Sequence, residues 1–421
     1  MHFIPSRLTT RIMQYNTYTL ANGLRLIHLP SSSEVVYCGY VISAGTRDEL
    51  PGEEGMAHFC EHATFKGTAR RRSMQILSSL ESVGGDLNAF TNKEDTVFHA
   101  AILKEHLARA VDVLTDIVFH STYPQAEIEK EIEVICDEIE SYNDSPAELI
   151  YDEFENAVFD GHPLGHNILG SAEQLRHYTA DDIRRFTSRR YRPENAVFFA
   201  YGDVDFSRLS RLVEKATEGF QSCKPLPGRR QDVALPAYKP VELIRHKGTH
   251  QAHVMMGNRA YGVGDSRRMA LYLLNNMLGG PAMSARLNVA LRERNGLVYT
   301  VDSSMVSYSD TGMWCVYFGC DPGDLKKCRR LVSRELDKMM QRPLSATALN
   351  AAKRQIKGQI GVACDNRENF AIDFGKTFLH YGRAKDITSL FARIDGITAE
   401  EMLAAAQEIF DEKKITVLEY V

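Results

Sequence analysis

Hydrophobic positions in the first half of the chain alternate between the two-residue period of β-strands and the three-to-four-residue period of α-helices. A turn signal at Asn22-Gly23 separates two strand-like runs within residues 17–28, which is typical of a β-hairpin. Further apolar runs predict strands at residues 35–44, 87–91 and 97–103. Helical periodicity predicts helices at residues 73–83, 107–118 and 126–142, and one more around residues 58–62. Helices and hairpin-like strands are therefore mixed along this half.

The second half of the chain repeats this order of elements. Its pattern predicts strands at residues 252–257, 297–304 and 313–319 and helices at residues 267–278, 283–294 and 325–340. A matching order in two halves indicates duplication. Neighbouring strands resemble hairpins more than strand–helix–strand units, which favours antiparallel pairing. We therefore predict the α+β class, with two homologous domains that each hold a mostly antiparallel mixed β-sheet packed with α-helices.

A loop-like segment separates the two halves. Residues 221–231 contain two prolines, a glycine and several basic residues between a helical pattern and a strand-like run. A chain of 421 residues is also too long for one hydrophobic core. We predict an N-terminal domain at residues 1–220 and a C-terminal domain at residues 232–421.

Composition and charge exclude several classes of protein. A net charge of −5 argues against nucleic acid as a partner, because nucleic-acid-binding domains present a basic face. No run of eighteen apolar residues occurs, so no membrane span is expected. Eight cysteines lack paired spacing, and no secretory signal is visible. We expect a cytoplasmic location; the alternative is the mitochondrial matrix, because residues 1–33 contain three arginines and no acid.

The candidate chemistry begins with residues 58–62, His-Phe-Cys-Glu-His. Histidines four residues apart on a helix lie on one face, one turn apart, which suits two imidazoles that bind one metal ion. Glu61 lies at the edge of that face, within reach of a water on the metal. The corresponding segment of the second half, residues 269–278, has no histidine or glutamate. This restriction favours a metal site at His58 and His62 over the alternative of a solvated helix with two unrelated histidines.

A catalytic zinc ion usually takes three protein ligands, so a third is expected elsewhere. The helix at 126–142 is rich in glutamate, and its isoleucines and Val134 define a core-facing side. Glu131 and Glu138 fall among these apolar positions, where a carboxylate is costly unless it is paired or coordinated. We predict Glu138 as the third ligand and Glu131 as a residue that orients a histidine. Two glutamates at the margin of a surface helix are the alternative.

These residues resemble the inverzincin peptidases, a family typified by the β subunit of the mitochondrial processing peptidase, pitrilysin and insulin-degrading enzyme. Members carry His-x-x-Glu-His, a glutamate ligand about 76 residues later, and a second glutamate seven residues before that ligand. Glu138 and Glu131 stand at those positions here. Further matching segments lie at residues 65–68, 84–91, 162–165, 169–170, 191–195, 202–204, 278–287 and 291–299. The resemblance therefore covers nearly the whole chain.

The resemblance implies a zinc-dependent endopeptidase. His58, His62 and Glu138 would bind Zn2+, and the ion would activate water and polarise a peptide carbonyl. Glu61 would be the general base, which takes the proton of the attacking water and passes it to the leaving amine. Glu131 would orient one of the histidine ligands through a hydrogen bond.

An arginine and a tyrosine of the second half complete the implied site. The family uses such a pair, seven residues apart, to stabilise the oxyanion, and Arg292 and Tyr299 match it. Family members of this length generally form half of a clamshell, so the pair would reach the zinc site of a partner chain. Because this chain carries both the ligands and the pair, we predict a homodimer with shared active sites that cleaves unfolded or short peptides.

Substrate binding is expected to use a strand edge. Asn88, Ala89, Phe90 and Thr91 follow a pair of glycines and are predicted to form an exposed strand beside the zinc site. An extended peptide that adds to this strand would be held by main-chain hydrogen bonds. The alternative is an internal strand without an open edge.

Two other functions remain open from the sequence. One is the catalytic subunit of a heterodimeric peptidase that cleaves targeting presequences. The other is a structural subunit without activity, like the core proteins of respiratory complex III that share this fold. Such proteins tend to lose the ligands or the base, whereas His58, Glu61, His62, Glu131 and Glu138 are all present here.

Overall fold

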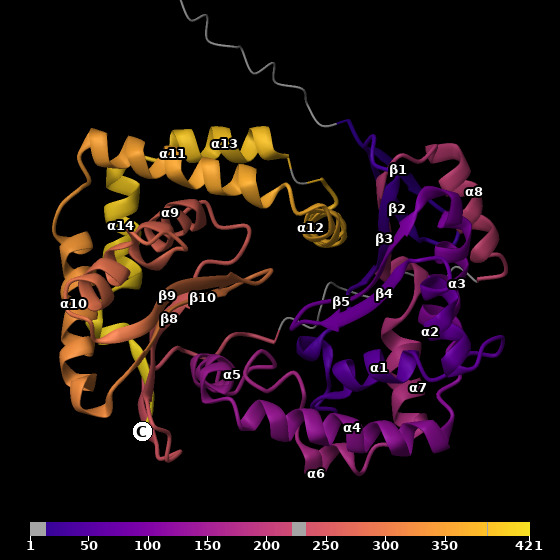
Figure 1. The fold of residues 1–421 in the computed structure, drawn as a ribbon, viewed down its shortest axis with the longest axis horizontal. Coiled ribbons are helices and arrows are strands. Elements are labelled where there is room, and N and C mark those ends of the chain that lie inside the picture. Colours follow the sequence, from indigo (N-terminus) through magenta and orange to yellow (C-terminus); the bar gives the residue numbers. More distant parts are fainter. Residues whose placement is uncertain (1–13, 221–232, 385) are drawn as a thin grey trace, which may run out of the picture.

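The computed structural model describes residues 14–220, 233–384 and 386–421 and contains two β-sheets, each packed with helices (Figure 1). The predicted linker at residues 221–231 lies entirely outside the described residues. The predicted boundary between residues 1–220 and 232–421 therefore stays a prediction.

The first sheet has six strands in the order β1 (Asn16–Thr19), β2 (Arg25–Pro30), β6 (Ala196–Gly202), β3 (Val35–Ile42), β5 (Thr96–Leu103) and β4 (Asp86–Thr91). Strands β2 and β6 are parallel, and the other neighbours are antiparallel. The predicted hairpin is confirmed, because β1 pairs with β2 and Gly23 has a φ of 90° in the turn.

The second sheet repeats this topology with five strands. Its order is β7 (Glu242–Arg245), β11 (Thr416–Tyr420), β8 (Ala252–Ala260), β10 (Gly312–Cys320) and β9 (Val298–Ser307). Strands β7 and β11 are parallel and the other pairs are antiparallel, as in the first sheet. The predicted α+β class with two similar mixed sheets is confirmed. In this correspondence β4 matches β9, and each is an edge strand.

The first half contains eight helices among its described residues. They are α1 (Met56–Thr64), α2 (Ser73–Glu81), α3 (Leu107–His120), α4 (Gln125–Asn143), α5 (Pro146–Val158), α6 (Ala172–Leu175), α7 (Ala180–Arg190) and α8 (Phe206–Ala216). Helices α1 and α4 of this set carry the candidate site. Buried aromatic rings such as Phe59 of α1, Phe98 of β5 and Phe186 of α7 belong to one hydrophobic cluster. This core holds α1 against the sheet.

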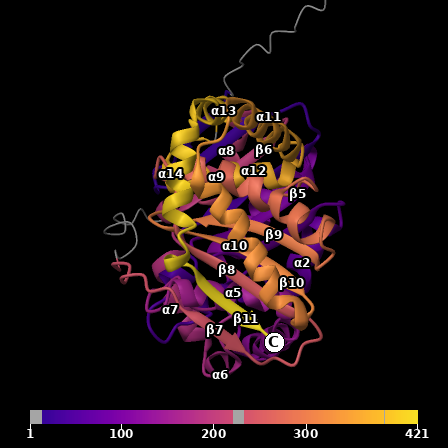
Figure 2. The same ribbon diagram turned by 90° about the vertical axis from the view of Figure 1, so that its left-hand side faces the viewer.

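Helices of the second half are α9 (Arg268–Gly279), α10 (Leu325–Gln341), α11 (Ala346–Ala363), α12 (Arg367–Tyr381), α13 (Ile387–Gly396) and α14 (Ala399–Ile409). Figure 2 shows α10 and α14 on the outer side of the second sheet. Trp314 of β10 is fully buried there and contacts Phe410, with ring centroids 4.4 Å apart.

The predicted regular helix at residues 283–294 is wrong in detail. The backbone forms a π-helix over Asn288–Glu293, in which the N–H of Arg294 bonds to the carbonyl of Val289. The side chain of Asn288 donates to the carbonyl of Met283 at 2.6 Å, so a side chain takes the place of a backbone donor at the start of this segment.

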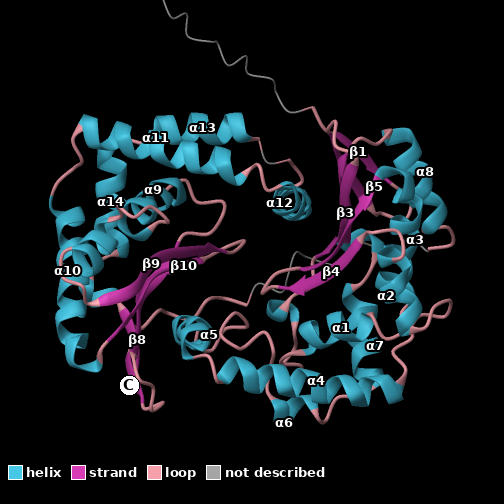
Figure 3. Cartoon of the chain, in the orientation of Figure 1, coloured by secondary structure: helices cyan, strands magenta, loops and turns pink. Residues whose placement is uncertain are grey.

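The two halves exchange one helix each. Helix α5 of the first half packs on the second sheet, where Ile150 and Phe154 are buried with Met255 and Leu418. Helix α12 of the second half packs on the first sheet (Figure 3). Gly375 of α12 meets the sheet so closely that a Cβ there would lie 2.7 Å from the ring of Phe199. Each half therefore buries part of its sheet only with the help of the other.

No helix of residues 14–220, 233–384 and 386–421 is long and apolar enough to cross a membrane. The cytoplasmic location expected from the sequence stays a prediction. Among these residues the cysteines are free thiols, and all but Cys364 are buried.

Candidate metal centre

Helix α1 carries the two histidines and is fixed at its N-terminus. Gly55 precedes it with a φ of 88°, a left-handed conformation that favours glycine. The buried carboxylate of Glu49 accepts hydrogen bonds from the N–H groups of Gly55 and Ala57, at 3.1 and 2.7 Å. A carboxylate there also interacts favourably with the helix dipole. His58 and His62 follow one turn apart, with ring centroids separated by 4.5 Å.

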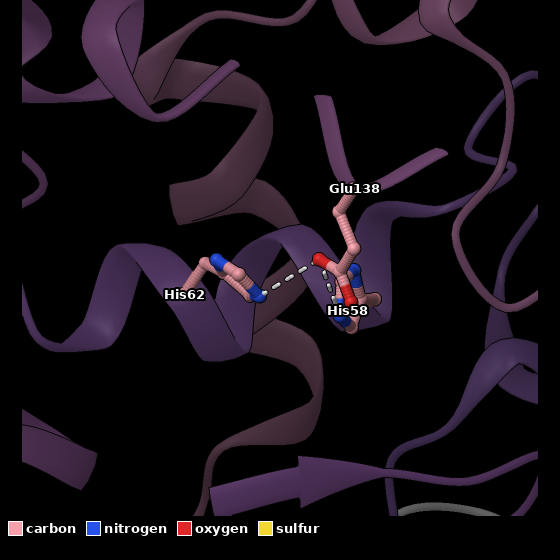
Figure 4. Close-up of side chains that lie close together, drawn as sticks. All are labelled: His58, His62 and Glu138. Atoms are coloured by element: carbon pink, nitrogen blue, oxygen red, sulfur yellow. Dashed lines mark ion pairs between the residues drawn. The ribbon is translucent and has the colours of Figure 1, made fainter. Parts of the chain in front are cut away.

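Helix α4 brings Glu138 to these histidines. Its Oε2 lies 3.6 Å from Nε2 of His62 and 3.9 Å from Nε2 of His58 (Figure 4). One ligand atom from each residue lies within 4.8 Å of the others. A tetrahedral zinc ion with bonds of about 2.0–2.2 Å needs ligand atoms about 3.4 Å apart. Two imidazoles and one carboxylate at these distances fit Zn2+.

Glu131 orients His62 from the side away from the cluster. Its Oε1 lies 2.9 Å from Nδ1 of His62, so Nε2 is left to face Glu138. Burial lowers the pKa of His62, but the bond to Glu131 and the nearby carboxylates outweigh burial and raise that pKa. Burial raises the pKa of Glu131, but its bonds to His62 and Lys66 outweigh burial and lower it. Glu131 is therefore an ionised carboxylate that fixes the ring.

His58 is held in its neutral form. Burial is the main cause, and the neighbouring His62 adds to it, so the pKa of His58 is lowered to about 3. A neutral imidazole is the form that binds a metal ion. Its Nδ1 is buried and has no hydrogen-bond partner among the described residues.

Glu61 lies beside the cluster and is held by the edge strand. The hydroxyl of Thr91 on β4 donates to Oε2 of Glu61 at 2.6 Å, and both residues are buried. Burial raises the pKa of Glu61, and the bond from Thr91 offsets part of that effect. A carboxylate with a raised pKa and a fixed position can accept and return a proton near neutral pH.

Two family models match the chain with this geometry. The model described as Insulinase (Peptidase family M16) matches residues 26–172, and the model described as Peptidase M16 inactive domain matches residues 177–356. The chain belongs to the M16 peptidase family. The first model covers the candidate metal ligands His58, His62 and Glu138, and the second covers most of the half that lacks them.

Relatives of this M16 chain carry zinc in their names. An uncharacterised zinc protease of Bacillus subtilis is 33% identical over 397 residues, which is 94% of this chain and 95% of the relative. Another, of Streptomyces coelicolor, is 34% identical over 398 residues, which is 93% of this chain and 86% of the relative. These names agree with the zinc-binding geometry of the cluster.

Solved structures share the fold. A protease from Helicobacter pylori superimposes with a TM-score of 0.90 at 20% identity, over 97% of this chain and 100% of that one. A peptidase M16 inactive domain from Pseudomonas fluorescens superimposes with a TM-score of 0.87 at 17% identity, over 96% and 98%. The M16 architecture therefore extends over nearly the whole chain.

The helical-wheel prediction for α4 is only half right. Glu131 is buried as predicted, but the side chain of Glu138 is 44% exposed, and Val134 is also exposed. Helix α4 contacts α1, α5 and α6, and these neighbours leave the carboxylate of Glu138 partly open to solvent.

The predicted substrate strand has an open edge. Strand β4 ends the order of the first sheet, so the alternative of an internal strand is wrong. Asn88 is exposed, Ala89 and Phe90 are half-buried, and Thr91 turns inward to Glu61. Sequence reasoning assigned Thr91 to substrate only, and the bond to the candidate base was missed.

Arg292 and Tyr299 lie beside each other in the second half of the chain. The guanidinium of Arg292 stacks over the ring of Tyr299, 5.5 Å from its centre, and Tyr299 is 80% exposed. Within the described part of the chain, neither side chain forms a hydrogen bond or ion pair with His58, His62 or Glu138. This exposure is compatible with the prediction that the pair serves another chain, which stays a prediction.

Lys66 was missed as part of the centre. It forms an ion pair with Oε2 of Glu131, while Oε1 of the same carboxylate holds His62. The available signal was its position four residues after His62, at helical spacing, although α1 ends at Thr64.

Replacing Glu131 with glutamine should lower zinc affinity by about 10–100-fold, because the ring of His62 loses its charged partner. The measurement is competition with a chromogenic zinc chelator. Glu129→Gln on the exposed side of the same helix is the matched control and should keep wild-type affinity. Equal affinity in both variants would contradict the orienting role of Glu131.

Proposed function

We propose that this protein is a zinc-dependent endopeptidase. The observation that carries the proposal is the buried Glu61 carboxylate, fixed by Thr91 beside a His58–His62–Glu138 cluster whose distances fit zinc. Membership of the M16 family and the zinc protease names of relatives support the same reading.

The mechanism follows from the roles of these side chains. Bound zinc supplies a Lewis acid that polarises a peptide carbonyl and makes water more acidic. His58, His62 and Glu138 hold the metal, with Glu131 fixing the tautomer of His62. Glu61 then takes the proton of the attacking water on its carboxylate and delivers it to the nitrogen of the leaving amine. The hydrogen bond from Thr91 holds that carboxylate in position during both proton transfers.

Strand β4 supplies the docking surface for substrate. Its outer edge has unpaired backbone N–H and C=O groups along Asn88–Thr91, and an extended peptide satisfies them as an added antiparallel or parallel strand. Because Thr91 also contacts Glu61, a peptide bound along this edge passes directly beside the base. Backbone recognition favours unfolded or short peptides over folded proteins.

Arg292 and Tyr299 of a second chain complete the proposed site as oxyanion donors. Both are exposed and pre-arranged as a stacked pair, so they are free to meet another subunit. Fixed donors at a developing oxyanion contribute about 10²–10³-fold in rate each. We propose a homodimer in which each zinc site takes this pair from its partner.

Hydrolysis of a mixture of quenched fluorescent peptides, with zinc content measured in parallel, tests the proposed function. About one zinc ion per chain together with cleavage that stops on chelation is the expected result. Bound zinc without cleavage would contradict the proposal for this chain alone and direct the search to a missing partner subunit or a structural role.

Mixing two inactive variants tests the shared site. Glu61→Gln lacks the base, and Tyr299→Phe lacks an oxyanion donor, so each homodimer should be strongly impaired. Random exchange of subunits in a homodimer regenerates about a quarter of the sites in intact form. Recovery of activity on mixing, with a dimeric mass by light scattering, is expected. A monomeric enzyme that retains activity would rule the homodimer out.

A further inference from the structure

Three consecutive charged residues are buried in the turn between β4 and β5. The turn consists of residues 92–95, and Lys93, Glu94 and Asp95 are 3%, 7% and 3% exposed. Charged side chains in a hairpin turn are ordinarily solvated, and their burial is costly unless each one is paired. The partners therefore reveal what this turn does.

Lys93 connects the turn to α5. Its Nζ lies 3.8 Å from Oε2 of Glu155 and also donates to the carbonyl of His166. The hydroxyl of Tyr308, just after β9, donates to the same Glu155. Helix α5 is the helix that packs on the second sheet, so Lys93 contacts the second half through it.

Glu94 connects the turn to the tip of the β9–β10 hairpin. Its Oε1 accepts hydrogen bonds from Nη1 of Arg47 and from the hydroxyl of Ser309, both at 2.8 Å, and its Oε2 accepts from the Ser309 N–H at 3.1 Å. Arg47 also donates to Oδ1 of Asp310 at 2.7 Å. This hairpin belongs to the second sheet.

Asp95 connects the turn to α12. Its carboxylate lies 2.9 Å from Nε2 of His380 and 3.1 Å from Nζ of Lys376. Burial raises the pKa of Asp95, but the bond to His380 and the charge of Lys376 outweigh it and lower the pKa to about 2. Each of the three charges thus contacts a different segment that belongs to the second half or packs on it.

The turn also leads directly to the proposed catalytic base. Thr91 is the residue before it, and Thr91 holds Glu61. On the other side, the backbone N–H of Arg47 donates to the carbonyl of Lys93 at 2.9 Å, and Arg47 stands two residues before Glu49, which caps α1. The turn is therefore connected to both β4 and α1.

We propose that residues 92–95 form a joint that transmits the position of the second half to Glu61 and to the substrate strand. Lys93, Glu94 and Asp95 are then positioning residues for peptide hydrolysis, and Glu94 is the central one because it and Arg47 together hold the β9–β10 hairpin. The expected effect on kcat rests on the proposed function, because it requires that the protein hydrolyses peptides. The expected effect on the local stability of β4 does not depend on activity.

Hydrogen exchange and kinetics on Glu94→Gln and Asp310→Asn test the joint. Amide exchange in the segment of β4 should rise by about tenfold or more, with exchange in β2 unchanged, because local opening is governed by the contacts of that segment. The value of kcat should fall by about tenfold at a KM within twofold of wild type, with zinc content retained. Asp310 is half-exposed, so Asp310→Asn is expected to fold and can be measured even if Glu94→Gln does not fold.

Glu153→Gln is the matched control. Glu153 on α5 pairs with Lys247 of the second half at 3.3 Å, so it also joins the two halves, but among the described residues it forms no hydrogen bond or ion pair with residues 92–95. This variant should keep wild-type kcat and wild-type exchange in β4. A similar loss in Glu153→Gln would mean that any contact between the halves has this effect, and would overturn the specific role of the joint.

A double variant decides whether the joint acts through Thr91. Thr91→Val removes the hydroxyl that holds Glu61, so adding Glu94→Gln should cause little further loss of kcat. The proposal would be overturned if the fold-losses of kcat in the two single variants multiplied in the double variant. It would also be overturned if Glu94→Gln and Asp310→Asn both kept wild-type kcat and wild-type amide exchange in β4. If the wild-type protein cleaves no peptide, the proposed function fails, and the exchange comparison by itself still supports or rejects the joint.

Discussion

Replacing Glu61 with glutamine is expected to lower the rate of peptide hydrolysis by about 10²–10⁴-fold, the usual contribution of a general base. Glutamine has nearly the same shape and still accepts the hydrogen bond from Thr91, but it cannot take a proton from water. The metal ligands are untouched, so zinc content and the melting temperature should stay close to those of the wild type.

The measurement is kcat/KM on a quenched peptide, with zinc determined on the same sample. Glu81→Gln, at the exposed end of α2, is the control for the loss of one carboxylate and should remain fully active. Hydrolysis by Glu61→Gln within threefold of the wild type would remove Glu61 from the mechanism, whereas loss of zinc would reassign it to the metal.

Replacing Glu138 with glutamine should weaken zinc binding by at least about 100-fold, because a carboxylate ligand contributes no less than the outer residues that support it. The neutral amide is a poorer ligand for a dication, and the two histidines alone leave an incomplete set. Activity at low zinc should disappear. A large excess of zinc should restore part of it, which distinguishes a lost ligand from a lost base.

The check is activity as a function of free zinc, set by a metal buffer. Glu133→Gln is the matched control on the same helix, since its exposed carboxylate is 3.7 Å from Arg176 and away from the cluster. It should follow the wild-type curve. If Glu138→Gln binds zinc as tightly as Glu133→Gln, then Glu138 is not a ligand.

Local sequence patterns predicted the fold class, and they predicted the proximity of His58 and His62 that the structure has. The spacing of His58 and His62 is set by helix geometry, which does not depend on distant residues. The order of strands and helices in the two halves likewise predicted two similar sheets, and both have the same topology. The turn at Gly23 was predicted because glycine favours the positive φ found there.

The periodicity of apolar residues did not predict which segments pack against each other in the tertiary structure. An apolar helix face shows that one side is buried but not which surface covers it, so periodicity could not predict that α5 and α12 each pack on the sheet of the other half. The exposure of Glu138 was missed for the same reason, because a helical wheel gives directions around an axis and does not tell where the packed neighbours end.

The sequence by itself therefore determined the metal-binding motif, the candidate base and the duplicated α+β plan, all of which follow from spacing along the backbone. Only the tertiary structure decided that β4 has an open edge, that Thr91 holds Glu61, and that the charged turn at residues 92–95 is buried. A run of Lys-Glu-Asp is ordinarily solvated, and it becomes a buried joint here because α5, α12 and the β9–β10 hairpin bring opposite charges and polar partners to it. Burial of charge depends on partners far apart in the chain, and local periodicity carries no information about them.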